Sequence, residues 1–216
     1  MPEDPLVWST NDWDEMLYTC SRTQEYMLTS LLNLKYSVER DHHHTMLRSI
    51  SGRLKTRESI EKKLVRYRFE VSPASACQNL HDIIGLRIIC SYIDDIYSVV
   101  DVLNTIDHYH ILEVKDYIKH PKKSGYRSLH VIGLCTAVQN RPVLCEIQLR
   151  TTAMDSWAAL EHQLRYKKNL PDSEYVNREL LECATMLNQT DVKMQRIHRF
   201  LDIQSHEEAG SDNSDH

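Results

Sequence analysis

Glycine and the common nucleotide-binding signatures are scarce or missing in this chain of 216 residues. Only five glycines occur, and they form neither a G-x-x-x-x-G-K-[ST] loop nor a G-x-G-x-x-G run. P-loop and Rossmann phosphate sites are therefore excluded. No segment approaches the stretch of about eighteen apolar residues that marks a membrane helix, and the acidic start MPEDPLVWSTNDWDE has no signal-peptide pattern. We expect a cytoplasmic protein with no membrane association.

Neither the cysteines nor the overall charge indicates a metal cluster or a broad nucleic-acid surface. The six cysteines are scattered, and no C-x-x-C pair is present. Cys90, Cys135 and Cys145 lie in apolar, strand-like runs, where a thiol packs as a small hydrophobic group. The formal net charge of −5 argues against binding nucleic acid without sequence preference. A disulfide framework and a zinc site are not expected.

Apolar runs that alternate with helical patterns predict a mixed α/β core with helical flanks. Short apolar runs indicate strands at 83–90, 110–115, 129–135 and 143–149. Helical spacing indicates helices at 12–40, 52–70, 94–106, 151–168 and 174–203, and a threonine caps the helix at 151–168. We expect a polar turn at 41–45, a loop at 72–79 and a disordered acidic tail after residue 204.

A cationic segment follows Gly52. From Arg53 to Arg68 it carries seven cations against two acids. Four polar residues are spaced 4, 4 and 3 apart and share one stripe of the predicted helix: Lys55, Ser59, Lys63 and Arg66. Such a stripe suits a polyphosphate lying along the helix, and the alternative is an ordinary solvated helix face.

Two carboxylates occupy positions that are otherwise apolar. Asp82 directly precedes the strand at 83–90, and Glu146 lies in the middle of VLCEIQL. An acid in such a place is unfavourable unless it is paired, solvated in a cleft or bound to a cation. On neighbouring strands the two could hold one Mg²⁺, with phosphate oxygens completing its shell. The alternative is a buried ion pair, and His81 is not expected to take part.

The segment HPKKSGYRSLH at 120–130 concentrates polar chemistry around one glycine. It holds three cations, a tyrosine and two histidines, and an apolar run follows it. This composition is typical of the lining of an anion site, and the alternative is a solvated surface loop. Gly125 would let the backbone turn tightly, and Tyr126 would offer a flat face to a base.

Five segments, in this order, resemble the RelA/SpoT alarmone synthetase domain. They are G-R-L-K at 52–55, H-D-I-I-G-L-R at 81–87, K-D-Y-I-K-H-P-K-K-S-G-Y-R-S-L-H at 115–130, E-I-Q-L-R-T at 146–151 and W-A-A-L-E-H at 157–162. The chain looks like a small alarmone synthetase without a hydrolase domain. The resemblance implies a mixed sheet of about five strands flanked by helices, akin to nucleotidyltransferases.

The resemblance also implies a domain division and a reaction. Residues 46–168 would form the synthetase core, with an N-terminal helical segment at 1–45, a C-terminal helix at 169–204 and a tail at 205–216. The family transfers the β,γ-pyrophosphate of ATP to the ribose 3′-hydroxyl of GDP or GTP. The products are ppGpp or pppGpp, together with AMP.

Roles follow for the matched positions. Arg53 and Arg87 would sandwich the adenine, and the ATP phosphates would be held by Lys55, Ser59, Lys63 and Arg66. Asp82 would bind Mg²⁺, and Glu146 would bind it too or accept the proton of the 3′-hydroxyl. The acceptor nucleotide would be held by Lys115, Lys122, Tyr126 and His130.

Four positions depart from relatives within the family. Glu113 stands where the long enzymes tend to carry an arginine, which leaves the choice between GDP and GTP open. Ser49, Ser51 and Asp155 replace an aromatic residue, a threonine and an asparagine of the alarmone-activated small synthetases. An aspartate that faces a polyphosphate effector would repel it, so we predict weak or absent activation by pppGpp.

Other functions and assemblies are compatible with the same motifs. A toxin branch of the family modifies the 3′ end of tRNA, and Lys119, Lys122, Lys123 and Arg127 offer a local basic patch for it. An adenine nucleotide as acceptor and an inactive nucleotide- or RNA-binding regulator are further alternatives. The last long helix could cover the core or pair copies into a homo-oligomer, for which the resemblance favours a tetramer.

Overall fold

The computed structural model describes residues 12–41, 44–166 and 174–211. In chain order the elements are α1 (Trp13–Asp41), β1 (Leu47–Leu54), α2 (Arg57–Tyr67), α3 (Pro73–Asn79), β2 (Ile84–Cys90), α4 (Ile93–Leu103), β3 (Tyr109–Asp116), β4 (Leu129–Cys135), β5 (Val143–Thr151), α5 (Thr152–Tyr166) and α6 (Glu174–Ser211). Five strands form one mixed sheet, as the resemblance implied, and their order is β1-β2-β5-β4-β3. Only β2 and β5 run parallel, and the other neighbours are antiparallel.

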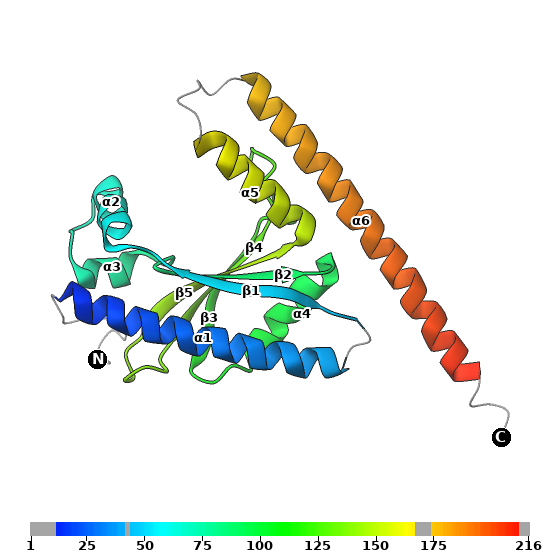
Figure 1. Ribbon diagram of the computed structural model, residues 1–216, viewed down its shortest axis with the longest axis horizontal. Helices are drawn as coiled ribbons and strands as arrows, with labels where there is room; N and C mark the ends of the chain where they lie inside the picture. The colour runs from blue at the N-terminus through cyan, green and yellow to red at the C-terminus, as the bar shows by residue number, and fades with distance from the viewer. Residues whose placement is uncertain (1–11, 42–43, 167–173, 212–216) are drawn as a thin grey trace.

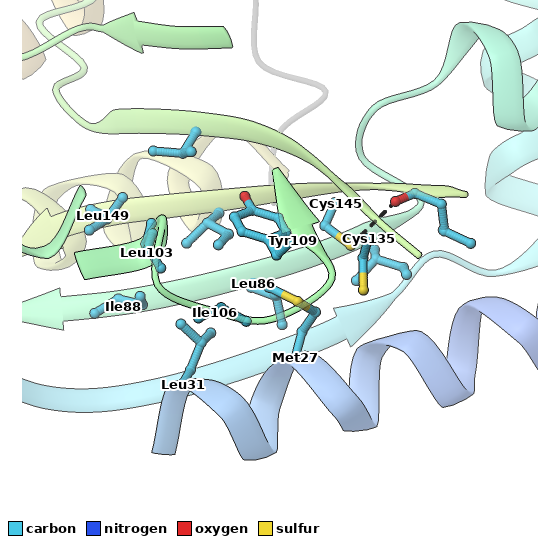
Figure 2. Packing of buried hydrophobic residues seen from close by; sticks show 14 of the residues in the cluster. Met27, Leu31, Leu86, Ile88, Leu103, Ile106, Tyr109, Cys135, Cys145 and Leu149 are labelled. Carbon is cyan, nitrogen blue, oxygen red and sulfur yellow. Dashed lines mark hydrogen bonds between the residues drawn. The ribbon is translucent and has the colours of Figure 1, made fainter. Parts of the chain in front are cut away.

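One face of the sheet is the hydrophobic core. Alternate residues of β2, such as Leu86 and Ile88, are buried on this face because side chains along a strand point to opposite sides. Helices α1 and α4 lie on that side of the sheet, and α5 lies on the other (Figure 1). Met27 and Leu31 of α1 join the same cluster as Leu86 and Ile88 (Figure 2). The helix at the N-terminal end is therefore part of the same core.

The predicted helix at 52–70 is wrong at its start. Residues 47–54 form the edge strand β1, which pairs with β2 and carries Arg53, and α2 begins only at Arg57. The physical reason is a helix cap: the Thr56 side chain accepts a hydrogen bond from the Ser59 backbone N–H and so sets the start of α2. Lys55 thus lies between strand and helix, and only part of the predicted stripe shares a helix face.

Two further segments differ from the sequence prediction. The predicted loop at 72–79 contains the short helix α3, which Ser72 caps and Pro73 begins. Helix α6 continues to Ser211, so the predicted disordered tail is helical up to that residue. Residues 212–216, and part of the predicted turn at 41–45, lie outside the described residues. No helix in the described ranges combines the length and apolar character that crossing a bilayer requires.

Gly133 of β4 provides a test of core packing. A Cβ added there would lie 2.3 Å from the ring of the buried Tyr109. We predict that Gly133→Ala lowers the free energy of unfolding by roughly 1–3 kcal/mol, because the ring has to move inside a packed core. Urea unfolding measures this loss. Gly85→Ala is the control, since its added Cβ would lie 3.7 Å from the nearest atom, and an equal loss in both variants would contradict the prediction.

Candidate active site

The face of the sheet opposite the core carries polar residues in register across all five strands. Two rows of cross-strand neighbours run over it, namely Arg53, Gly85, Glu146, Ile132 and Glu113 in one row and Ser51, Arg87, Gln148, His130 and Lys115 in the next. Partners in register share a face. Residues that are up to about a hundred positions apart in the sequence are therefore brought together by strand pairing alone.

A cleft of about 650 Å³ opens on this face between β1, β2 and α5. Arg53 and Arg87, the predicted adenine pair, both line it, together with Tyr126. The Arg53 side chain packs over Gly85, with its Cγ 3.7 Å from where a Cβ would stand. Two guanidinium groups and one aromatic ring suit flat, electron-rich ligands such as purines.

A second cleft of about 390 Å³ lies beside the first. Its cations are Lys63 and Lys115, and Tyr67 and Phe69 line it as well. Asp82 and Glu146 line both clefts. The two carboxylates therefore stand where ligands from the two clefts would meet.

Asp82 is held by two lysines. Its Oδ2 lies 2.5 Å from Lys55 Nζ, and its Oδ1 lies 2.7 Å from Lys63 Nζ. Lys55 is fixed by its backbone N–H, which donates to the Ile83 carbonyl at 2.9 Å. Burial raises the pKa of Asp82, but the two ammonium groups outweigh burial, so the pKa lies below its usual range. Asp82 is therefore ionised at neutral pH.

Glu146 belongs to a closed ring of hydrogen bonds. Its Oε1 lies 3.0 Å from His130 Nδ1, and His130 Nε2 lies 2.8 Å from the Tyr126 hydroxyl. Arg150 donates to that hydroxyl at 2.8 Å and to Gln148 Oε1 at 2.7 Å. The Gln148 amide closes the ring by donating to Glu146 Oε2 at 2.9 Å.

The ring keeps Glu146 ionised and oriented. Burial raises its pKa, but the hydrogen bonds from His130 and Gln148 outweigh burial and bring the pKa below the usual range. An ionised Glu146 can only accept, so His130 donates to it through Nδ1, while Nε2 lies within hydrogen-bond distance of the Tyr126 hydroxyl. His130 is buried and has both ring nitrogens occupied within the protein.

The loop around Gly125 takes the tight turn expected from the sequence. Gly125 has a φ of 88°, and its N–H donates to the Lys122 carbonyl at 2.8 Å. Lys122 Nζ then lies 4.9 Å from the centre of the Tyr126 ring, and Arg150 Cζ lies 5.3 Å from it. The tyrosine is thus held by cations as well as by its hydroxyl.

Five predicted site residues line neither cleft in the part of the chain that the structure describes: Lys55, Ser59, Arg66, Lys122 and His130. Ser59 is exposed and bonded to Thr56, and the Arg66 guanidinium lies 5.9 Å from the Tyr67 ring. Lys122 is exposed on its loop. Of the predicted phosphate stripe, Lys55 and Lys63 are the members that converge on Asp82.

Sequence reasoning missed Gln148 and Arg150, although a signal for both was present. In E-I-Q-L-R they stand two and four residues after Glu146, so in a strand all three share one face. It also missed Tyr67, Phe69 and the cleft position of His81. No sequence signal singled these out, because they reach the cleft only through the packing of α2 and α3 beside the sheet.

Comparisons with known proteins identify the family of this chain. The family model "Region found in RelA / SpoT proteins" matches residues 52–170. The chain belongs to the RelA/SpoT family. It is 38% identical over 202 residues to the GTP pyrophosphokinase YwaC of Bacillus subtilis, covering 92% of this chain and 96% of that protein. It is 32% identical over 188 residues to the GTP pyrophosphokinase YjbM of the same organism, covering 86% and 88%.

RelA/SpoT structures share the fold as well. The small alarmone synthetase 1 of B. subtilis, solved with its product pppGpp, superposes with a TM-score of 0.78 at 31% identity, over 86% of this chain and 96% of that one. The small alarmone synthetase 2 of B. subtilis gives 0.73 at 38% identity, over 87% and 98%. These similarities confirm the predicted fold and the resemblance stated from the motifs.

Asp155, one of the residues that differ from the alarmone-activated small synthetases, pairs with two arginines in this structure. Asp155 Oδ1 lies 2.8 Å from Arg150 and 3.3 Å from Arg87. Its charge is therefore balanced by two arginines of the same chain, one in the ring and one in the larger cleft. Weak activation by pppGpp stays a prediction.

The pairing of Asp82 with Lys63 predicts a pH-dependent stability. A group with a lowered pKa stabilises the fold above the ordinary carboxyl range, and that contribution disappears as the pH falls through the lowered pKa. We expect Lys63→Met to lower the free energy of unfolding by about 1 kcal/mol at pH 7. Denaturant unfolding at pH 7 and in acid below pH 3.8, the ordinary value, checks this.

The matched control is Lys62→Met. Lys62 stands next to Lys63 but pairs with the exposed Glu58. The Lys62→Met substitution should change the free energy of unfolding little at either pH, because exposed ion pairs contribute little to stability. A loss in Lys63→Met that is the same at both pH values would contradict the proposed dependence on the ionised Asp82.

Proposed function

We propose that this chain is a (p)ppGpp synthetase, which transfers the β,γ-pyrophosphate of ATP to the 3′-hydroxyl of GDP or GTP and releases AMP. The observation that carries the proposal is the position of Asp82 and Glu146, which line both clefts and are flanked by cations. A transfer between two polyphosphates needs charge neutralisation on both sides and one group that accepts a proton. Its relatives YwaC and YjbM bear the name GTP pyrophosphokinase.

The larger cleft would hold both purines. Arg53 and Arg87 would contact the adenine, and Tyr126 would stack on the guanine. The two phosphate chains would then meet at the carboxylates, close to Lys55 and Lys63. Lys115 and Lys122 would contact the acceptor's phosphates from the smaller cleft and from the loop. Ser59 and Arg66 would meet the outer phosphates of ATP from α2.

The chemical step needs one proton transfer and one displacement. Glu146 accepts the proton of the ribose 3′-hydroxyl, and the 3′-oxygen forms a bond to the β-phosphorus of ATP. The bond between that phosphorus and the oxygen bridging to the α-phosphate breaks, and this oxygen leaves as part of AMP. Because the ring through His130 and Gln148 fixes the carboxylate, Glu146 does not have to reorient during the step.

Mg²⁺ fits the residues present. No group of three or more His, Cys, Asp or Glu in the described residues could hold a metal ion. Mg²⁺, however, is usually held by one or two carboxylates together with substrate phosphates and water. Asp82 and Glu146 would supply the carboxylates, and the ion would neutralise charge that develops on the phosphates.

A pyrophosphate-transfer assay tests the function. With γ-labelled ATP and Mg²⁺, we expect label on GDP or GTP when these and deacylated tRNA are offered separately. Glu146→Gln should reduce the rate by about 10²–10⁴-fold, since loss of a general base typically has that effect. Chelation of Mg²⁺ should abolish transfer, and added Mg²⁺ should restore it.

The acceptor that receives the label decides between the alternatives. Label on tRNA alone would contradict the proposal and indicate a toxin that inhibits translation by modifying tRNA. Label on an adenine nucleotide alone would make this an adenosine alarmone synthetase. Asp101→Asn is the matched control for the carboxylate substitution. Asp101 is exposed on α4 and should leave the rate unchanged.

We also propose a homo-oligomer, with a tetramer favoured. Helix α6 exposes large apolar side chains along its length, namely Leu181, Met186, Met194, Ile197, Phe200 and Leu201. A second copy would remove this surface from water. Light scattering at micromolar concentration should give a multiple of 25.4 kDa, and Phe200→Glu should lower the mass. A wild-type monomer would contradict the proposal.

A further inference from the structure

Helix α6 forms the surface on which the Gly125 loop rests. A Cβ added to Gly125 would lie 2.5 Å from Ala184 Cβ, so helix and loop are in direct contact. Trp157 of α5 donates its indole N–H to the Leu180 carbonyl of α6 at 2.9 Å. Trp157, Leu180 and Ala184 form a second buried cluster, against which Tyr126 packs. The loop that presents Tyr126 is thus supported from behind by α6.

The same stripe of α6 carries one carboxylate against the loop. Leu180, Ala184, Leu187 and Asp191 follow each other at intervals of 4, 3 and 4 residues, which places them on one helix face. Asp191 Oδ2 accepts a hydrogen bond from the Thr151 hydroxyl at 2.5 Å. Gly125, Arg127 and Asp191 also line one small cavity of about 10 Å³, so little free space separates them.

Asp191 is connected to both sides of Tyr126. Its charge interacts with Arg127, whose guanidinium donates to the Gly125 carbonyl at 3.2 Å. Its other partner, Thr151, follows Arg150, which donates to the Tyr126 hydroxyl. Burial raises the pKa of Asp191, and Thr151 and Arg127 offset only part of that effect. An unfavourably placed carboxylate at this point is consistent with a role beyond the stability of the fold.

We propose that Asp191 is a positioning residue for the acceptor nucleotide, because it bonds α6 to Thr151 and places its charge beside the same small cavity as Arg127, which bonds the loop that carries Tyr126. The inference rests on the proposed function for the identity of the acceptor. Asp191 lines neither cleft, so a substrate bound in them would not contact it there. Its effect should therefore appear in acceptor binding and leave ATP binding unchanged.

Asp191→Asn keeps the size of the side chain and removes its charge. Arg127 then loses a nearby counter-charge, and the loop keeps only its packing contacts with α6. We expect the KM for GDP or GTP to rise about tenfold, with the KM for ATP within twofold of the wild type. Arg127→Gln should give the same pattern, and the double variant should be no worse than either single one, because both remove one interaction.

Glu182→Gln is the matched control. Glu182 is exposed on another face of α6 and should leave both KM values unchanged. Equal increases in both KM values for Asp191→Asn, an acceptor KM within twofold of the wild type, or independent effects in the double variant would each overturn the inference. A general loss of folded protein would lower kcat without this selectivity.

Amide hydrogen exchange gives a readout that does not depend on activity. Residues 122–128 should exchange faster in Asp191→Asn, while the amides of β2 and β5 keep their protection. If the wild type proves inactive with every acceptor, the proposed function fails and exchange still tests the attachment. If Asp191→Asn does not fold, the Arg127→Gln variant becomes the test of the inference. An unchanged KM for the acceptor together with unchanged amide exchange in Arg127→Gln would then overturn it.

Discussion

The site depends on keeping the Glu146 carboxylate ionised on a strand whose other face is hydrophobic core. Cys145 and Ile147, its neighbours along β5, are fully buried, so the strand cannot move to solvate the acid. A closed ring of hydrogen bonds through His130, Tyr126, Arg150 and Gln148 provides the stabilisation that water would otherwise give. Removal of any one of these side chains leaves a hydrogen-bond donor or acceptor of its neighbour in the ring without a partner.

Two charge arrangements meet at the boundary between the clefts. Asp82 is compensated by two lysines, whereas Glu146 is compensated by hydrogen bonds from His130 and Gln148. The difference suits two tasks, because lysines beside Asp82 remain available to phosphates and a hydrogen-bonded Glu146 keeps a fixed direction. Tyr126 links this region to the helices, since it belongs to the ring and also packs against the cluster that α5 forms with α6.

Strand alternation made part of the site predictable. Asp82 and Glu146 were identified because an acid beside or inside an apolar strand needs an explanation, and Gly125 because a scarce residue stood in a polar loop. The stripe assigned to one helix was divided by the Thr56 cap, yet Lys55 and Lys63 still converge on Asp82. His130 looked like a ligand contact, but both of its ring nitrogens are bonded within the protein.

The sequence by itself determined the family, four of the five strands and most of the polar residues around the clefts, because motif order and strand periodicity are local properties of the chain. Only the tertiary structure decided which of these residues meet. Cross-strand register places Arg53 beside Gly85 and Gly85 beside Glu146, and helix packing places Asp191 against the Gly125 loop. Such contacts join segments that are far apart in the sequence. Local sequence patterns carry no information about which distant segments pack together.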